Sequence, residues 1–261
     1  MSHFSVAIIT EDWAKESDIE DILFPYSENM QVKPYVSETV EDLAKEFEEF
    51  KKKIENKESA YYEEQQQKYN ILAMKPKEFA KWYYGEDSHF DLKGNLLTTY
   101  NPDSKWDWFQ IGGRWSDLLI LRTTSAKTNQ TFLNLVDWKK MNKLSKKDEK
   151  YWKRFWDIAI EDSSQTKLEL KKHQYFILYK KEYYLEQYKN KEMFLKRKAE
   201  FATHAVVTPD GEWHEQGKMG WFGFSDTKPK EGEEWDLGFY EKFIKPFLNT
   251  DYIITIVDCH I

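Results

Sequence analysis

The stretch from Lys105 to Trp115 concentrates side chains that are suited to holding a ligand. Two adjacent glycines, Gly112 and Gly113, can expose backbone amides that form a concavity for an anion. Arg114 follows with a planar guanidinium that matches phosphate or carboxylate, and tryptophan faces can stack on a base or ring. We therefore predict ligand-binding roles for Lys105, Trp106, Trp108, Gly112, Gly113, Arg114, Trp115 and, in a second glycine- and aromatic-rich segment, Trp221.

The same stretch also fits a plain hairpin, in which the tryptophans fill a core and the glycines only make the turn. The sequence contains no Walker loop and no G-x-G-x-x-G fingerprint after a predicted strand. No established nucleotide-binding motif therefore decides between a ligand platform and a structural hairpin.

Three histidines, His3, His204 and His260, stand at or near the ends of predicted strands. Asp258 and His260 alternate along the last strand, so their side chains share a face. If the first and last strands pair antiparallel, His3 approaches both, which gives a cluster able to bind a metal or to act as general acid and base. Cys259 points to the opposite face and is expected to be a buried thiol.

These residues are catalytic candidates only if the protein is an enzyme, and structural or surface histidines are the alternative. No metal-ligand spacing such as H-E-x-x-H is present, so we predict no metal and no cofactor. The sequence also lacks a matched nucleophile and base, which makes a non-catalytic protein the favoured prediction.

The elements that must position these side chains predict an α+β fold. Strands are expected at both ends of the chain, over 4–9 and 252–261. Gly112-Gly113 is expected to form a tight hairpin turn or a bulge, followed by a returning strand over 115–121. Helical spacing of apolar residues predicts one helix from residue 40 towards 69, capped by Ser37 or Thr39, and a long helical run over 167–200. We expect a mostly antiparallel sheet that includes both terminal strands, with helices packed on it and a helical insertion. The predicted division is 1–124 and 201–261 for the two parts of the core and 125–200 for the insertion.

The amino-acid composition excludes further classes of protein. The chain has 261 residues, a net charge of −7 and one cysteine, which excludes an internal disulfide framework. The acidic balance argues against general nucleic-acid binding, although a local basic patch from Lys139-Lys140 to Lys153-Arg154 stays open. We find no signal peptide and no apolar run long enough to span a membrane, and so expect a cytoplasmic protein.

The segments NPDSKWDWFQIGGRW, THAVVTPDGEWHEQGKMGWFG and VDCHI together resemble a family of uncharacterised bacteriophage and prophage proteins. The resemblance covers the two ends, the central stretch and the second glycine-aromatic segment, about half of the chain. It implies a phage accessory protein in the cytoplasm of a host cell, and a role against host defence.

On that basis we expect a protein that binds and sequesters a small nucleotide-derived signal at the tryptophan–arginine stretch. One alternative is a metal- or histidine-dependent hydrolase or phosphodiesterase acting on a nucleotide through His3, His204, Asp258 and His260. Another is a protein-binding inhibitor of a host defence factor that docks through the helical insertion. Assembly into a homo-oligomer stays open.

Overall fold

The computed structural model describes residues 2–85, 87–161, 179–219, 225–249 and 251–261. It confirms the α+β class. The chain forms two compact units, one built from Met1–Ser27 and Asp103–Ile261 and the other from Glu28–Pro102. The proposed division at 124 and 200 stays a prediction.

The first unit is organised around a sheet with the strand order β10-β9-β1-β11-β5, and β8 also pairs with β11. The two terminal strands lie side by side in antiparallel register, with His3 opposite His260 and Thr10 opposite Ile253. Only β1 and β9 run parallel among these pairs, so the sheet is mostly antiparallel. The strands are β1 (His3–Thr10), β5 (Trp108–Ile111), β8 (Gln130–Phe132), β9 (Ala205–Val207), β10 (Trp213–Glu215) and β11 (Ile253–His260).

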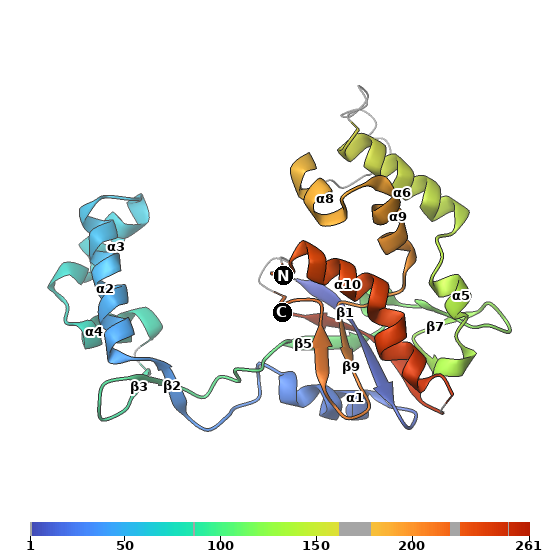
Figure 1. The fold of residues 1–261 in the computed structure, drawn as a ribbon. Helices are drawn as coiled ribbons and strands as arrows, with labels where there is room; N and C mark the ends of the chain where they lie inside the picture. Colours follow the sequence, from blue (N-terminus) through green and yellow to red (C-terminus); the bar gives the residue numbers. More distant parts are fainter. Residues whose placement is uncertain (1, 86, 162–178, 220–224, 250) are drawn as a thin grey trace. The chain divides into compact units, whose positions relative to one another are not determined.

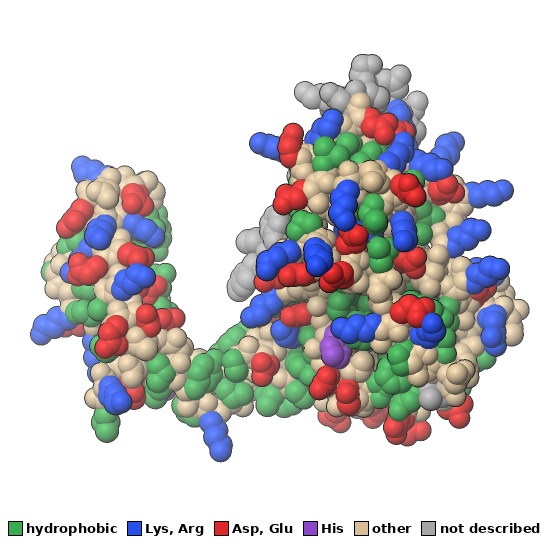
Figure 2. All heavy atoms as spheres, in the orientation of Figure 1, with side chains coloured by type: hydrophobic (Ala, Val, Ile, Leu, Met, Phe, Trp, Pro, Cys, Tyr) green, Lys and Arg blue, Asp and Glu red, His purple; other side chains and the backbone are tan. Residues whose placement is uncertain are grey.

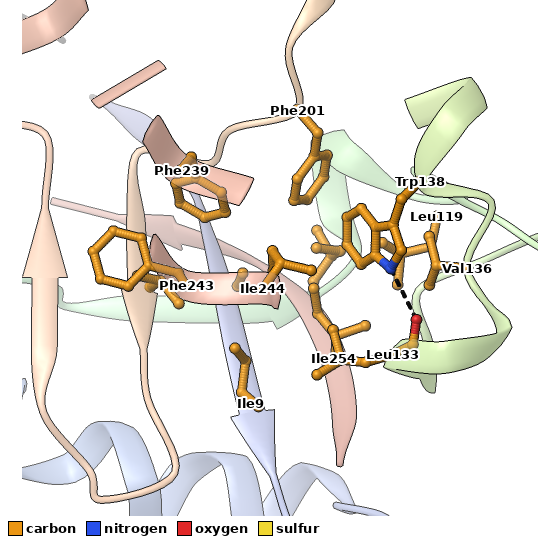
Figure 3. Packing of buried hydrophobic residues seen from close by; sticks show 13 residues of the cluster. Ile9, Leu119, Leu133, Val136, Trp138, Phe201, Phe239, Phe243, Ile244 and Ile254 are labelled. Carbon is orange, nitrogen blue, oxygen red and sulfur yellow. Dashed lines mark hydrogen bonds between the residues drawn. The ribbon is translucent and has the colours of Figure 1, made fainter. Parts of the chain in front are cut away.

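Both faces of this sheet are covered by other elements, since successive residues of β1 and β11, which point to opposite faces, are buried. One face packs against α10 (Pro229–Phe239) and the π-helix η6 (Tyr240–Ile244) that follows it, as Figures 1 and 3 show. Trp138 closes this core at one side and donates its indole N–H to the carbonyl of Leu133 at 2.9 Å. The other face packs against α1 (Glu16–Leu23) through Ile19 and Leu23.

A helical group forms a separate core on Phe155, Trp156 and Phe194. Its helices are α6 (Lys146–Ala159), α8 (Lys181–Tyr188) and α9 (Lys191–Ala199), and α5 (Trp138–Met141) precedes them. The Arg197 side chain is buried and forms an ion pair with Asp236 of α10 at 2.8 Å, which ties α9 to the sheet-covering helix. The single long helix predicted over 167–200 is therefore wrong for its described part: Lys189 adopts a φ of +62° between α8 and α9. Residues 162–178 lie outside the described residues.

The remaining elements of the first unit are short. They are η1 (Phe24–Tyr26), η3 (Gly113–Trp115), β6 (Leu119–Ile120), β7 (Lys127–Thr128), η4 (Leu133–Leu135) and η7 (Lys245–Phe247).

The second unit has its own core, in which Phe47, Phe50 and Phe79 lie against Ile54 and Ile71. Thr39 caps the first helix of this unit, α2 (Val40–Glu55), as predicted: its hydroxyl accepts a hydrogen bond from the backbone amide of Asp42 at 3.2 Å. That helix ends at Glu55 instead of continuing, since Lys57 takes a φ of +52°. The elements are β2 (Tyr35–Glu38), α2 (Val40–Glu55), α3 (Ala60–Tyr69), η2 (Ile71–Ala73), α4 (Pro76–Tyr84), β3 (His89–Phe90) and β4 (Leu96–Thr98).

Candidate functional site

The Gly112-Gly113 pair does not make a hairpin. β5 pairs with β11, whereas the predicted returning strand is reduced to β6, which pairs with β7. Gly112 has a φ of +74° and Gly113 a φ of +50°, so the chain leaves β5 through the short turn η3. The hairpin prediction was wrong because positive φ at consecutive glycines suits several kinds of turn.

This turn wraps around a carboxylate of the protein itself. The amide of Gly112 donates to the Ile256 carbonyl at 2.8 Å, and the amide of Arg114 donates to Asp258 Oδ2 at 3.0 Å. A Cβ on Gly113 would lie 2.4 Å from the Asp258 Cβ, so only glycine fits there. The carboxylate of Asp258, which is 1% exposed, occupies the place that the sequence suggested for a ligand anion.

Asp258 is also part of a histidine–aspartate cluster at the end of the sheet where both termini lie. His3 Nδ1 is 2.9 Å from Asp258 Oδ1, and His260 Nδ1 is 2.5 Å from Asp107 Oδ1. The two imidazole centroids are 5.1 Å apart. The structure thus brings His3, Asp258 and His260 together, and adds Asp107, to which no sequence pattern pointed.

The aspartates determine which ring nitrogen carries the proton. An ionised carboxylate only accepts hydrogen bonds, so Nδ1 of His3 and of His260 must be the donor in each pair. In the neutral imidazole this leaves Nε2 as an acceptor with a free lone pair. Each histidine therefore presents a nitrogen of defined protonation away from its aspartate.

Three buried polar side-chain atoms lack a hydrogen-bond partner in the described part of the chain, and all lie near this end of the sheet. They are Ser2 Oγ, His204 Nε2 and His260 Nε2. The amide of His204 donates to Ser5 Oγ at 3.2 Å, and Ser5 lies opposite Asp258 in the sheet. Burial lowers the pKa of His204, because a charged imidazole is poorly solvated there. Buried polar atoms in proteins normally have a hydrogen-bond partner, so three such atoms without one near the same end of the sheet are unusual.

Apart from the two glycines, the predicted ligand-binding residues are found in different environments. Trp106 is buried and donates its indole N–H to Leu23, and Trp115 packs against the sheet core. Lys105 forms an ion pair with Glu215 at 2.8 Å. Trp108, 49% exposed and 6.2 Å from the His3 ring, and the exposed Arg114 remain open to solvent. Trp221 lies outside the described residues.

Cys259 lies on the opposite face of the sheet, fully buried, as predicted. Burial raises the pKa of its thiol, which keeps it protonated and unreactive. No group of three or more histidine, cysteine or acidic side chains could hold a metal ion within the described ranges.

A second surface of unusual chemistry follows α5 and the start of α6. Between residues 139 and 154 the chain has eight lysines and arginines and two acidic residues. Figure 2 shows Lys and Arg side chains (blue), interspersed with acidic ones (red), on the part of the surface where Figure 1 draws α5 and α6. Five of the lysines are exposed and form no ion pair among the described residues, and we call them the lysine face: Lys139, Lys143, Lys146, Lys147 and Lys150.

The lysine face adjoins a pocket of about 570 Å³ that includes Lys139. Arg122 lines it with a second exposed cation, Tyr240 provides an aromatic ring, and Asn134 and Asn249 provide amides. The sequence signal for this surface was the basic patch, which the overall acidic charge outweighed in the prediction.

None of the helices in the described ranges combines the length and apolar character needed to cross a membrane. A family model for mitochondrial ribosomal protein L27 matches residues 10–71, about a quarter of the chain. No curated protein and no solved structure matches the chain significantly.

The family match corrects several predictions. The resemblance to a bacteriophage or prophage family is wrong, because the matching family is that of a ribosomal protein. The anti-defence role, the host defence partner and the host-cell cytoplasm depended on that resemblance and are overturned with it. The predicted partners, which included the expectation against general nucleic-acid binding, are overturned by the same match to a ribosomal protein family.

Sequestration of a small nucleotide-derived ligand is overturned by the same match, and the geometry supplies a reason. The amides of Gly112 and Arg114 are already engaged by β11, and Trp106 is buried. The two alternatives, a nucleotide hydrolase or phosphodiesterase and an inhibitor of a host factor, find no support in the match either.

Proposed function

We propose that this protein binds RNA through the lysine face. The observation that carries the proposal is the set of five exposed lysines, spaced one to four residues apart and without an ion pair among the described residues. A lysine that already forms an ion pair gains little free energy by contacting a phosphate. An unpaired lysine that neutralises a phosphate displaces a counterion of the nucleic acid, and this release favours binding. The lysine face therefore has the character of a phosphate-contacting surface.

Charge is segregated along the chain in a way that favours this surface. Residues 125–200 have 19 lysines and arginines against 11 acidic residues, and the rest of the chain has 20 against 35. A polyanion is attracted to the basic part and repelled by the remainder. The net charge of −7 hides this asymmetry.

The ribosomal family match supports RNA as the polyanion, although it covers a different part of the chain. Residues 10–71 contain 17 acidic and 8 basic residues, so that segment is unsuited to contacting phosphates. We therefore assign the RNA contact to the lysine face and the adjoining pocket. Arg122, Lys139 and Tyr240 line this pocket. In this proposal Arg122 and Lys139 hold backbone phosphates, and Tyr240 stacks on an unpaired base.

The test is the salt dependence of binding to a single-stranded RNA oligonucleotide, measured by fluorescence anisotropy. Each phosphate neutralised on a single strand contributes about −0.7 to the slope of log K against log salt, so full use of the lysine face gives about −3.5. Replacement of all five lysines by glutamine should remove most of that slope.

The matched control replaces five exposed lysines of the second unit by glutamine: Lys33, Lys45, Lys52, Lys57 and Lys93. This control removes the same charge and should leave the slope unchanged. Equal slopes for the parent and the lysine-face variant would refute the proposal, because the contacts would then lie elsewhere.

A further inference from the structure

A pocket of about 330 Å³ lies where the end of β1, helix α1 and the turn after β9 meet, and we call it the Trp13 pocket. Trp13 lines it with an indole ring that is 56% exposed. Part of the lining is apolar and consists of Ile9, Ala14, Ile22 and Pro209. Three exposed carboxylates also line it, those of Glu11, Asp12 and Asp18. The pocket therefore combines an apolar wall, an exposed aromatic ring and negative charge.

Strand β8 holds the segment 11–14 of this pocket in place. The side-chain amide of Gln130 donates to the Ala14 carbonyl at 2.9 Å. The Trp13 ring lies against the ring of Phe132 on the same strand, with the two centroids 6.3 Å apart. Because the segment is already fixed, a ligand does not have to order it on binding, and this lowers the entropic cost of association.

The carboxylates of the pocket are held by neutral donors, so their charge is not balanced. The hydroxyl of Tyr252 donates to Glu11 Oε1 at 3.2 Å, and the backbone amide of Lys15 donates to Asp18 Oδ2 at 2.8 Å. None of the three carboxylates forms an ion pair with another described residue. Residues 9–22 have six acidic side chains and one basic side chain, that of Lys15, and residues 208–212 add two acidic ones. This surface therefore attracts a cation.

We propose that the Trp13 pocket is a docking site for an arginine side chain in a basic segment of a protein partner. The aliphatic part of that side chain packs on the apolar wall. Its guanidinium stacks on the Trp13 ring and donates hydrogen bonds to the carboxylates. Arginine fits better than lysine, because a planar group can stack on a ring and bind a carboxylate at two points. RNA is repelled by the same carboxylates, so this partner differs from that of the lysine face.

The test uses a fluorescein-labelled hexaarginine peptide, which is titrated with the full chain and followed by fluorescence anisotropy. Trp13→Ala should weaken binding by about fivefold, through the loss of one cation–π contact. Glu11→Gln combined with Asp12→Asn should weaken binding by about tenfold, because it removes two exposed ion pairs and keeps the shape of the side chains. A hexalysine peptide should bind the parent more weakly than hexaarginine does.

Each variant has a matched control elsewhere in the chain. Trp108→Ala removes a tryptophan of β5 that is 49% exposed, and Glu55→Gln combined with Glu58→Gln removes two exposed carboxylates of the second unit. Both controls should bind hexaarginine as the parent does. Equal weakening in the controls would overturn the proposal, because the peptide would then respond to net charge alone. Parental binding by Trp13→Ala, or equal binding of hexalysine, would also overturn it.

Two further measurements identify the occupant. Analytical ultracentrifugation of the parent tests whether the lysine face of a second copy fills the pocket. Self-association that Glu11→Gln with Asp12→Asn abolishes would overturn the assignment to a separate partner, and a monomeric parent is expected. The same double variant should bind single-stranded RNA as the parent does. Loss of RNA binding in that variant would show that the pocket and the lysine face take the same ligand, and it would refute the proposal.

Discussion

Substitution of Gly113 by alanine tests how the turn η3 is held on the last strand. The added Cβ would lie 2.4 Å from the Asp258 Cβ and 2.5 Å from its Oδ2, far inside van der Waals contact. Either the turn or the aspartate must move. The hydrogen bond from the Arg114 amide to the buried carboxylate is then lost.

The magnitude follows from two contributions. Alanine at a φ of +50° costs about 1–2 kcal/mol relative to glycine. Loss of a hydrogen bond to a charged group costs about 1.5–3 kcal/mol more. The sum is about 2.5–5 kcal/mol, and at about 2–4 °C per kcal/mol for a unit of this size the Tm should fall by about 5–20 °C.

Gly211→Ala is the matched control, because Gly211 has a φ of +83° and no atom lies within 4 Å of the position that an added Cβ would take. It incurs the backbone cost alone, so its Tm should fall by about 2–8 °C. Differential scanning calorimetry of both variants measures the difference. Equal shifts would refute the reasoning, because they would mean that Asp258 accommodates the methyl group and does not fix the turn.

Three other predictions concern single side chains. Because burial lowers the pKa of His204, its contribution to stability is present above the unfolded pKa and is lost as pH falls, so His204→Gln should reduce the drop in Tm between pH 7 and pH 5. Cys259 is fully buried with a raised pKa, so iodoacetamide should label it only at the rate of unfolding, and rapid labelling of the native protein would contradict its placement. Phe79→Ala should destabilise the second unit by about 3–5 kcal/mol and leave the calorimetric transition of the first unit unchanged.

The sequence was informative where a side chain's place follows from strand pairing. Strands were predicted at both ends of the chain in one mostly antiparallel sheet, and the two-residue period of a strand placed Asp258 and His260 on one face. His3 was expected to approach them on the condition that the two terminal strands pair antiparallel, and the observed register meets that condition, with His3 opposite His260. Helix capping could also be predicted, because it depends only on residues close in sequence: the hydroxyl of Thr39 accepts a hydrogen bond from the backbone amide of Asp42.

The sequence failed where a local pattern is compatible with several distant partners. Two glycines in a row indicate positive φ, but they do not say whether the chain returns along β5 or turns onto β11. The density of tryptophans drew attention to Trp106, which is buried, and away from Asp107 beside it, whose partner is 153 residues away. Net charge misled in the same way, because an average over the chain conceals a basic segment within an acidic protein.

The lysine face and the histidine–aspartate cluster differ in how an RNA phosphate could use them. The lysines are exposed on α5, on α6 and between the two helices, and they act through long-range charge, which salt screens. In the cluster each aspartate is already paired with a histidine, and the backbone amide of Arg114 also donates to Asp258. A steep salt dependence of RNA binding that the five glutamine substitutions remove therefore assigns the phosphates to the lysines, whereas a steep dependence that survives those substitutions assigns them elsewhere.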